Sequence, residues 1–188
     1  MNEQTARQPG PVIAVRAETV ADAPARDALI DRAMGPNWRR KASHRLRRGR
    51  RPSEGLAFVA VDEAGGIAGT VRLWDVRAGD GGIAALLLGP LAVDPAMKSA
   101  GIGSALMRHA VAEARRLGHH AVLLVGDAPY YARFGFGAEK TGALAMPGPY
   151  ERERFLALEL KEGALDGASG TLVATGRKAR PEPLAQAA

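Results

Sequence analysis

Alternation of hydrophobic and polar positions divides the chain into short strands and helices. Period-two alternation or continuous apolar runs predict strands at residues 12–18, 56–62, 67–76, 83–93, 121–125 and 155–160. Helices are predicted, mainly from apolar residues at helical spacing, at residues 21–34, 41–48, 101–117 and 129–134. A meander of strands comes first and strands that alternate with helices follow. We therefore expect an α+β fold with three layers (α/β/α) and a mixed, mostly antiparallel central sheet.

The length of 188 residues fits one domain with extensions at both ends. We expect a flexible leader at residues 1–11, a globular domain at residues 12–160, and an extension at residues 161–188 that becomes a polar tail from Gly176. The absence of cysteine excludes disulfides and thiolate nucleophiles within these residues. The sequence has no run of 18 apolar residues and no secretory signal, so we expect no membrane span and a cytoplasmic location.

Positive charge is concentrated in one segment. Residues Arg39 to Arg51 include eight Lys and Arg and no acid, and without them the net charge falls from +6 to −2. Nucleic-acid-binding domains usually carry a basic face built from several elements. Only 5% of all 188 residues are aromatic, so a surface that stacks bases, and with it binding to nucleic acid, is disfavoured. A solvated surface, attraction of an anionic ligand and contact with an anionic polymer stay open as interpretations of this segment.

The strand at residues 83–93 contains Gly89-Pro90 within an apolar run. Proline cannot donate a hydrogen bond to a neighbouring strand and glycine weakens a strand, so this dipeptide predicts a β-bulge. We expect the central sheet to splay open here, between its fourth and fifth strands. Main-chain N–H and C=O groups left unpaired at the opening would be available to an extended ligand that has amides of its own.

A glycine-rich turn follows the same strand and leads into the helix at residues 101–117. Gly101 and Gly103 allow main-chain N–H groups to approach a ligand, and a helix start has free N–H donors and the positive end of the helix dipole. Together with Lys98, these features are typical of an anion site, often for pyrophosphate; a glycine-rich turn without a ligand is the alternative. The turn lacks the Walker pattern, and Leu106 stands where a dinucleotide-binding turn has its third small residue.

Three segments, in order, resemble the GNAT superfamily of N-acetyltransferases. The turn Lys98-Ser-Ala-Gly101-Ile-Gly103 is similar to the signature [Gln/Arg]-x-x-Gly-x-[Gly/Ala], with lysine in the usual Gln/Arg place. The strand at residues 89–95 looks like this family, and Tyr131-Ala-Arg-Phe-Gly-Phe136 resembles its Tyr-x-x-x-Gly-Phe ending. The resemblance covers residues 12–160 and looks closest to a bacterial subgroup of predicted acetyltransferases whose substrate is unassigned. It implies the acyl-CoA N-acyltransferase fold.

The resemblance also implies an N-acetyltransferase enzyme that uses acetyl-CoA as a cosubstrate and needs no metal. Family members bind acetyl-CoA across the splayed strands, with pantetheine lying like an extra strand and pyrophosphate at the helix start. Carried over, main-chain groups of Leu91, Ala92 and Val93 would bind pantetheine and the acetyl carbonyl. The pyrophosphate cradle would consist of Lys98, Ser99, Ala100, Gly101, Ile102, Gly103 and Ser104. Lysine at position 98 would weaken the affinity for CoA or change its salt dependence.

Tyr131 is the expected catalytic acid, because it stands four residues before Gly135, where the family's tyrosine lies near the CoA sulfur. A phenol with a pKa near ~10 stays protonated at neutral pH and can donate its proton to a thiolate. Tyr130 is the second candidate, and packing of a short helix on the sheet is the alternative role of both. With no cysteine to carry an acyl group, we expect direct attack by a primary amine in a ternary complex.

The general base is not defined by the sequence. Asp75 and Asp127 are candidates that can equally be solvated turn residues, and a water chain is a third option. Asp94, which precedes Pro95, is expected to form a turn. The four histidines lack the spacing of metal ligands, so we expect no metal site; they are His44, His109, His119 and His120. Trp38 and Trp74 either line an acceptor pocket or pack within the fold.

Two classes of function follow. The first is an acetyl-CoA-dependent N-acetyltransferase that acts on a small-molecule amine or on a protein amine. The second is a non-catalytic module on the same fold that senses CoA or binds an anionic polymer. In this family the region that holds Arg39 to Arg51 supplies much of the acceptor site, where the segment would attract an anionic acceptor or the 3′-phosphate side of CoA. The acceptor, and the choice between a monomer and a homodimer, do not follow from the sequence.

Overall fold

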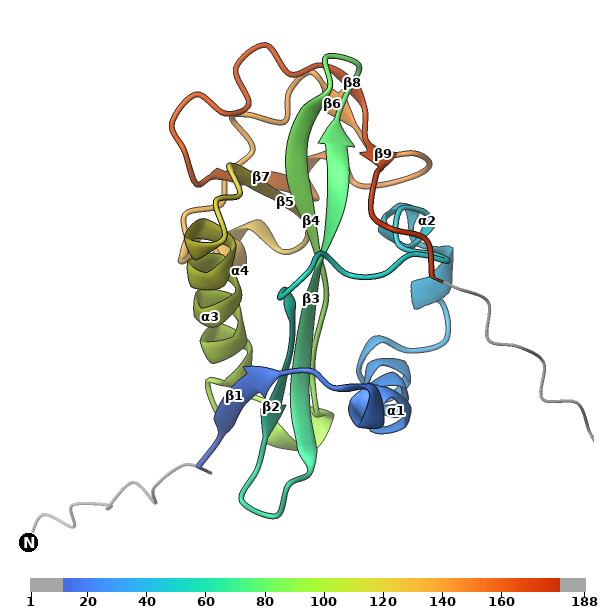
Figure 1. Ribbon diagram of the computed structural model, residues 1–188, viewed down its shortest axis with the longest axis vertical. Coiled ribbons are helices and arrows are strands. Elements are labelled where there is room, and N and C mark those ends of the chain that lie inside the picture. The colour runs from blue at the N-terminus through green and yellow to red at the C-terminus, as the bar shows by residue number, and fades with distance from the viewer. Residues whose placement is uncertain (1–11, 180–188) are drawn as a thin grey trace, which may run out of the picture.

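A seven-stranded mixed sheet forms the centre of the structure, a computed structural model that describes residues 12–179 (Figure 1). Neighbouring strands follow the order β1-β2-β3-β4-β5-β7, and β9 pairs with β3 beyond the end of β2. Each neighbouring pair in this sheet is antiparallel except β4 and β5, which run parallel. The strands are β1 (Ala14–Ala17), β2 (Ala57–Val61), β3 (Ile67–Ala78), β4 (Ile83–Val93), β5 (Ala121–Val125), β7 (Phe155–Glu159) and β9 (Val173–Ala174).

Helices cover both faces of the sheet. In Figure 1, α3 and α4 lie on one face and α1 and α2 on the other. The α-helices are α1 (Ala23–Met34), α2 (Ala42–Arg45), α3 (Ile102–Arg116) and α4 (Ala128–Ala132). Short 3-10 helices occupy Val20–Asp22, Trp38–Arg40, Pro95–Met97 and Arg152–Arg154, and β6 (Leu144–Ala145) pairs with β8 (Gly170–Thr171) in a separate small sheet. The expected three-layer α+β fold with a mostly antiparallel sheet is confirmed.

The apolar run of β4 is buried on both faces of the sheet. Leu86 and Leu88 belong to the core beneath α3, whereas Ala85 and Leu87 belong to a second core on the opposite face. Side chains alternate between the two faces of a strand, so a continuous apolar run is the pattern expected of a strand covered on both sides. The position of β4 in the middle of the sheet agrees with this pattern.

Pairing is interrupted around Gly89-Pro90, as the sequence predicted. On the β3 side, Val71 pairs with Leu91 and Leu73 pairs with Leu88, so two residues of β4 stand opposite Arg72 alone. On the β5 side, pairing is confined to Leu86 and Leu87 of β4. The second half of β4 therefore has β3 on one side and no paired strand on the other, which confirms the splay between the fourth and fifth strands.

Two expectations about the chain's elements need correction. The helix expected at residues 41–48 is shorter, because α2 ends at Arg45 and turns lead to Gly49, whose φ is +69°. Like charges three and four residues apart disfavour a helix, and this segment carries many. The part of the expected tail at residues 176–179 is paired: the N–H of Arg51 donates to the carbonyl of Arg177 (2.8 Å). The expected leader at residues 1–11 and residues 180–188 lie outside the described residues.

Close packing of α3 on β3 allows a test of the fold. A Cβ atom at Gly69 of β3 would lie 2.9 Å from Ile102 Cγ2 and 2.9 Å from Leu106 Cδ1. We expect Gly69→Ala to lower the free energy of unfolding by ~1–3 kcal/mol, because the helix must shift to admit the methyl group. Urea denaturation measures this. Gly81→Ala is the matched control, since no atom lies within 4 Å of its added Cβ; equal stability of both variants would contradict the packing.

Candidate functional site

The start of α3 has main-chain donors with no acceptor among the described residues. The first backbone bond of the helix runs from the N–H of Ala105 to the carbonyl of Gly101 (3.0 Å), and no side chain caps the N–H groups of residues 102–104. Gly101 has a φ of +78° and Ser99 a φ of +69°, and the turn reaches the helix through these left-handed positions. Free N–H groups and the helix dipole favour an anion at this point.

A cavity of about 390 Å³ opens in front of this helix start. Two cations, Lys98 and Arg133, contribute to its wall, and no acidic side chain of residues 12–179 does. Arg133 was missed by the sequence analysis, although it stands within the Tyr-x-x-x-Gly-Phe segment. The wall consists of Val93, Met97, Lys98, Ser99, Gly101, Ile102, Gly103, Ser104, Tyr130 and Arg133. The structure thus brings most of the expected cradle together around one positively charged cavity.

The three remaining residues of the expected CoA site are placed differently. Ala100 is exposed in the same turn but does not line the cavity. Leu91 and Ala92 lie in β4 beyond the bulge, paired with Val71 and Thr70 of β3. In a strand, main-chain groups of alternate residues point to opposite neighbours, so half of those in this part of β4 point away from β3, where no strand pairs with them. An extended ligand with amide groups fits this edge.

The adjacent tyrosines point to different places. A Cβ atom at Gly103 would lie 2.8 Å from the Oη atom of Tyr130, so this hydroxyl lies at the start of α3. The guanidinium of Arg133 lies 4.6 Å from the centre of the Tyr130 ring. Tyr131 packs on Gly126, directly after β5, where a Cβ atom would lie 2.1 Å from its Cε2 atom. Burial raises the pKa of Tyr131 to about 12, so its hydroxyl is protonated at neutral pH.

The carboxylates considered as bases have structural contacts. Asp127 is the N-cap of α4, where its Oδ2 atom accepts from the N–H of Tyr130 (3.2 Å). Asp75 accepts from Ser53 Oγ (2.7 Å), and neither aspartate lines the α3-side cavity. Asp94 forms the expected turn: its Oδ1 atom accepts from the N–H of Ala96 (2.9 Å).

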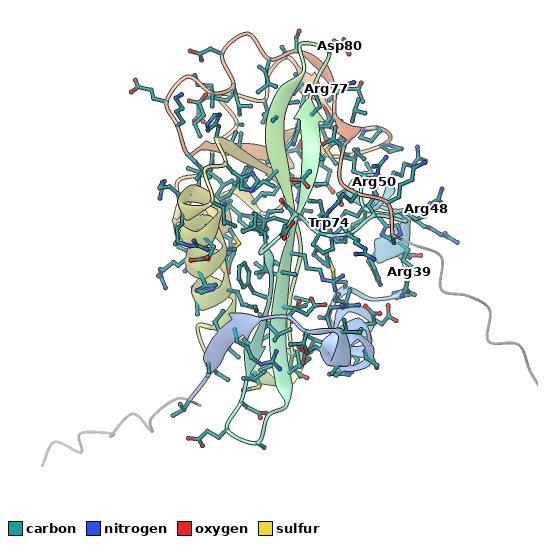
Figure 2. All side chains as sticks on the ribbon, in the orientation of Figure 1. Arg39, Arg48, Arg50, Trp74, Arg77 and Asp80 are labelled. Atoms are coloured by element: carbon teal, nitrogen blue, oxygen red, sulfur yellow. The ribbon has the colours of Figure 1, made fainter. Side chains whose placement is uncertain are left out.

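Trp74 holds the bulge of β4 in place. Its Nε1 atom donates to the carbonyl of Gly89 (2.5 Å), and its ring is buried in the core on the α2 side of the sheet (Figure 2). Trp38 is also buried, but its Nε1 atom donates to the exposed carboxylate of Asp31 (2.7 Å). Of the two tryptophans, Trp74 therefore bears directly on the shape of the sheet opening.

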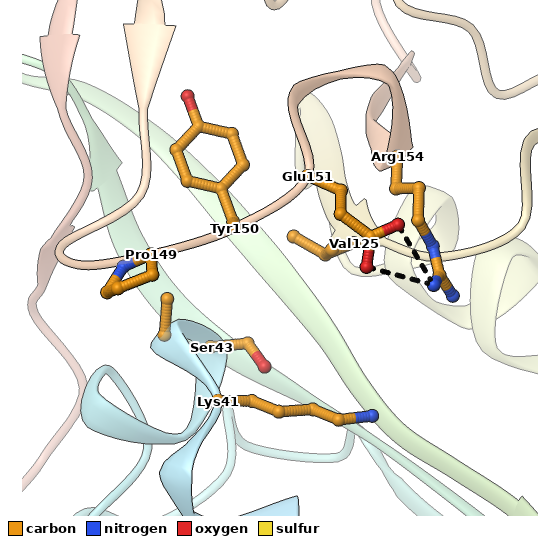
Figure 3. A pocket seen from close by; sticks show the side chains of 8 residues that line it. Lys41, Ser43, Val125, Pro149, Tyr150, Glu151 and Arg154 are labelled. Atoms are coloured by element: carbon orange, nitrogen blue, oxygen red, sulfur yellow. Dashed lines mark hydrogen bonds and ion pairs between the residues drawn. The ribbon is translucent and has the colours of Figure 1, made fainter.

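A second pocket, of about 160 Å³, lies on the α2 side and reaches the end of β5 (Figure 3). Lys41 and Ser43 from the start of α2 face the segment that carries Glu151 and Arg154. Glu151 Oε2 and Arg154 Nη1 are 3.4 Å apart. Val125, Ala42, Pro149 and Tyr150 complete the wall. Sequence reasoning missed Glu151, because residues 141–154 contain no motif and no strong periodicity.

Two of the four histidines pack against aromatic rings. His44 meets the ring of Trp38 edge-on at 5.0 Å, and His109 meets Phe58 at 4.6 Å. Within residues 12–179, no three His, Asp or Glu side chains are grouped so that they could hold a metal ion. None of the helices formed by these residues is long and apolar enough to cross a membrane.

A family model, a similar protein sequence and solved structures all indicate the same family for this chain. Residues 53–137 match the model of the acetyltransferase (GNAT) domain. The N-acetyltransferase YhbS of Escherichia coli K12, itself uncharacterised, is 30% identical over 159 residues, which are 83% of this chain and 92% of that protein. The chain belongs to the GNAT family of N-acetyltransferases. As a GNAT protein it is an acyltransferase enzyme, and the sequence-based expectation of this family is confirmed.

Solved GNAT structures support the same conclusion. The crystal structure of Escherichia coli YhbS in complex with CoA superimposes with a TM-score of 0.73 at 27% identity and covers 90% of this chain and 93% of that one. A GNAT acetyltransferase from Brucella melitensis in complex with acetyl-CoA superimposes with a TM-score of 0.63 at 25% identity, over 87% of this chain and 96% of that chain. The acyl-CoA N-acyltransferase fold is therefore confirmed for this GNAT chain.

The contact between Trp74 and Gly89 leads to a prediction about the bulge. Trp74→Phe removes the donor to the Gly89 carbonyl, and we expect a loss of ~1–3 kcal/mol in unfolding free energy because that acceptor loses its partner. Thermal or urea unfolding measures the loss. Trp38→Phe is the control, because the exposed Asp31 can bond to water instead. A larger loss for Trp38→Phe than for Trp74→Phe would be evidence against this role.

Proposed function

We propose that this GNAT protein transfers the acetyl group of acetyl-CoA to a primary amine by direct attack in a ternary complex. One observation carries the proposal: the strand pairing of β4 and β5 stops beside a helix start whose donors are free. A thioester carrier with an amide-containing arm and a pyrophosphate complements both features. When bound, it supplies the activated acetyl group. The absence of cysteine from the sequence favours transfer without an acyl-enzyme.

Main-chain groups provide most of the hydrogen bonds to the cosubstrate. Leu91, Ala92 and Val93 offer the unpaired edge of β4 to the pantetheine amides, and the turn at residues 98–104 offers N–H groups to the pyrophosphate. Fixed N–H dipoles at the bulge also suit the negative charge that develops on the acetyl oxygen. Lys98 and Arg133 add positive charge at the phosphate end, and the Tyr130 hydroxyl lies beside Gly103 there.

Tyr131 is proposed as the group that stabilises the departing sulfur. Its ring lies against Gly126, at the end of β5 where the opening begins, whereas Tyr130 is directed to the phosphate end. A pKa of about 12 keeps the phenol protonated, and it also makes proton release harder. Tyr131 therefore acts chiefly by donating a hydrogen bond to the thiolate as the carbon–sulfur bond breaks.

Glu151 is proposed to receive the proton of the attacking amine, directly or through water. Among the described residues it is the only carboxylate in the wall of the α2-side pocket. That pocket reaches Val125 at the end of β5. Asp75 and Asp127 have the structural contacts described above and do not line this wall. The acetyl carrier and the acceptor would then approach the opening from opposite faces of the sheet.

Binding of CoA is the first test. Isothermal calorimetry should detect CoA binding to the purified protein, and Gly103→Ala should weaken it by ~10-fold or more, since the added methyl group collides with Tyr130 and enters the cradle. Gly81→Ala should bind CoA as the wild type does. No detectable heat with CoA would overturn the proposed function.

The role of Tyr131 is tested by comparing two single-oxygen deletions. Tyr131→Phe should lower kcat for acetyl transfer by ~10²-fold with little change in KM for acetyl-CoA. Tyr130→Phe should instead raise that KM and leave kcat close to wild type. Since burial raises the pKa of Tyr131 to about 12, ionisation of this phenol should cause no loss of kcat below pH ~10. Equal effects of the two variants would contradict the assignment.

The role of Glu151 is tested through pH. Glu151→Gln should lower kcat/KM at neutral pH by ~10²-fold and recover as the pH rises, because a neutral acceptor amine no longer needs a base. Initial rates between pH 6 and pH 10 measure this, on the scale of ordinary amine pKa values. Glu153→Gln, at an exposed neighbour outside the pocket wall, is the control. A loss that stays constant with pH would exclude Glu151 as the base.

A further inference from the structure

Arg47 is a buried cation without a negatively charged partner. Only 6% of its surface is exposed, whereas Arg45 and Arg48 beside it are exposed. Its Nε atom donates to the carbonyl of Ser43 (3.1 Å) and its Nη2 atom to Ser43 Oγ (3.4 Å). No carboxylate in residues 12–179 forms an ion pair with it.

Arg26, the other buried arginine among the described residues, differs from Arg47 in having charged partners. Arg26 is buried to a similar extent, with 7% exposed, and it is paired with both Glu18 and Asp27. Burying a charge without a counter-charge is strongly unfavourable, and burial lowers the pKa of Arg47 to about 10.

Arg47 lies between Ser43, a residue of the α2-side pocket, and the bulge of β4. Ser43, to which it is bonded, lines the α2-side pocket. On the other side, a Cβ atom at Gly89 in the bulge of β4 would lie 3.4 Å from Nη1 of Arg47. Every fully buried side-chain nitrogen or oxygen among the described residues has a hydrogen-bond partner. Nη1 has no hydrogen-bond partner among residues 12–179 and therefore, within this part of the chain, is not fully buried.

We propose that Arg47 binds the acceptor through a carboxylate, so that the substrate class is a primary amine that carries a carboxylate group. This inference rests on the proposed function. One guanidinium with free Nη1 donors matches one carboxylate in charge and in hydrogen-bonding geometry. An anion at this place would provide the counter-charge that the fold does not. The exposed cations Arg40, Arg45 and Arg48 on the same segment would attract such an acceptor.

The test uses amines in matched pairs, with and without the carboxylate. Glycine and glycinamide, β-alanine and β-alaninamide, and lysine and lysinamide are compared in a thiol-release assay with acetyl-CoA. In the wild type, kcat/KM should be higher for the carboxylate member of a productive pair by ~10-fold or more. Arg47→Met should abolish this preference and leave CoA affinity, measured by calorimetry, unchanged. Arg47→Lys should retain part of the preference, and Arg115→Met, at an exposed position of α3, should retain all of it.

A wild-type experiment covers the case in which Arg47→Met does not fold. Propionate should inhibit competitively against the amine, and propionamide should not. Equal turnover within every pair, a preference that persists in Arg47→Met, or no inhibition by propionate would overturn the inference. O-phosphoethanolamine used in preference to β-alanine would assign the site to a phosphate and overturn the carboxylate.

The failure of this inference can be told apart from the failure of the proposed function. If CoA binds but no carboxylate-bearing amine is acetylated, the acceptor class is wrong and the CoA site stands. If CoA does not bind, the proposed function itself fails. A merely structural Arg47 would change stability and lower the turnover of both members of a pair equally.

Discussion

The loss of strand pairing between β4 and β5 is the constraint on which the rest of the site depends. Two residues, Gly89 and Pro90, stand opposite one residue of β3, and pairing with β5 does not continue beyond Leu87. The indole of Trp74 bonds to the Gly89 carbonyl, so the irregular part of β4 is held from its own neighbour strand. Without this interruption, a closed ladder would satisfy the main-chain groups that we propose for binding the cosubstrate.

The two faces of the sheet supply different chemistry at this interruption. On the α3 side, within the part of the chain that the structure describes, are a helix start with free N–H donors and a cavity lined by two cations and no acid. On the α2 side is a smaller pocket with a lysine, a serine and a carboxylate paired with an arginine. The proposed function assigns the first to the pyrophosphate of the cosubstrate and the second to the amine acceptor.

Two kinds of buried arginine occur among the described residues: Arg26, which is paired with carboxylates, and Arg47, which is not. Buried ionic groups that only hold elements together are paired, as in the cluster of Glu18 with Arg26 and Arg72 that ties the end of β1 to α1 and β3. Arg47 lies between Ser43 of the α2-side pocket and the bulge, and it has no such partner within residues 12–179. Unpaired buried charge is unfavourable for folding, and such groups are concentrated at functional sites. The contrast between these arginines is the reason for assigning Arg47 to substrate.

The sequence by itself determined the order of the main strands and helices, the bulge and the glycine-rich turn before α3, because each depends on local properties. It did not predict the short strands β6, β8 and β9. Proline lacks an N–H, glycine permits a left-handed turn, and an apolar run predicts a strand buried on both sides. These three properties depend on the local sequence and not on distant parts of the chain. The family signature around residues 98–104 adds to the same local information. Arg133, within the motif, could have been noticed because it stands beside the tyrosines.

Only the tertiary structure decided which polar groups meet. Tyr130 and Tyr131 are adjacent in sequence, yet one reaches Gly103 and the other covers Gly126, because successive residues of a helix point in different directions. Glu151 joins residues of α2 that are more than a hundred positions away. In the basic segment, eight similar residues give no sign that Arg47 alone of its neighbours is buried and unpaired. Burial and partner choice are set by contacts between distant segments, and no local pattern encodes them.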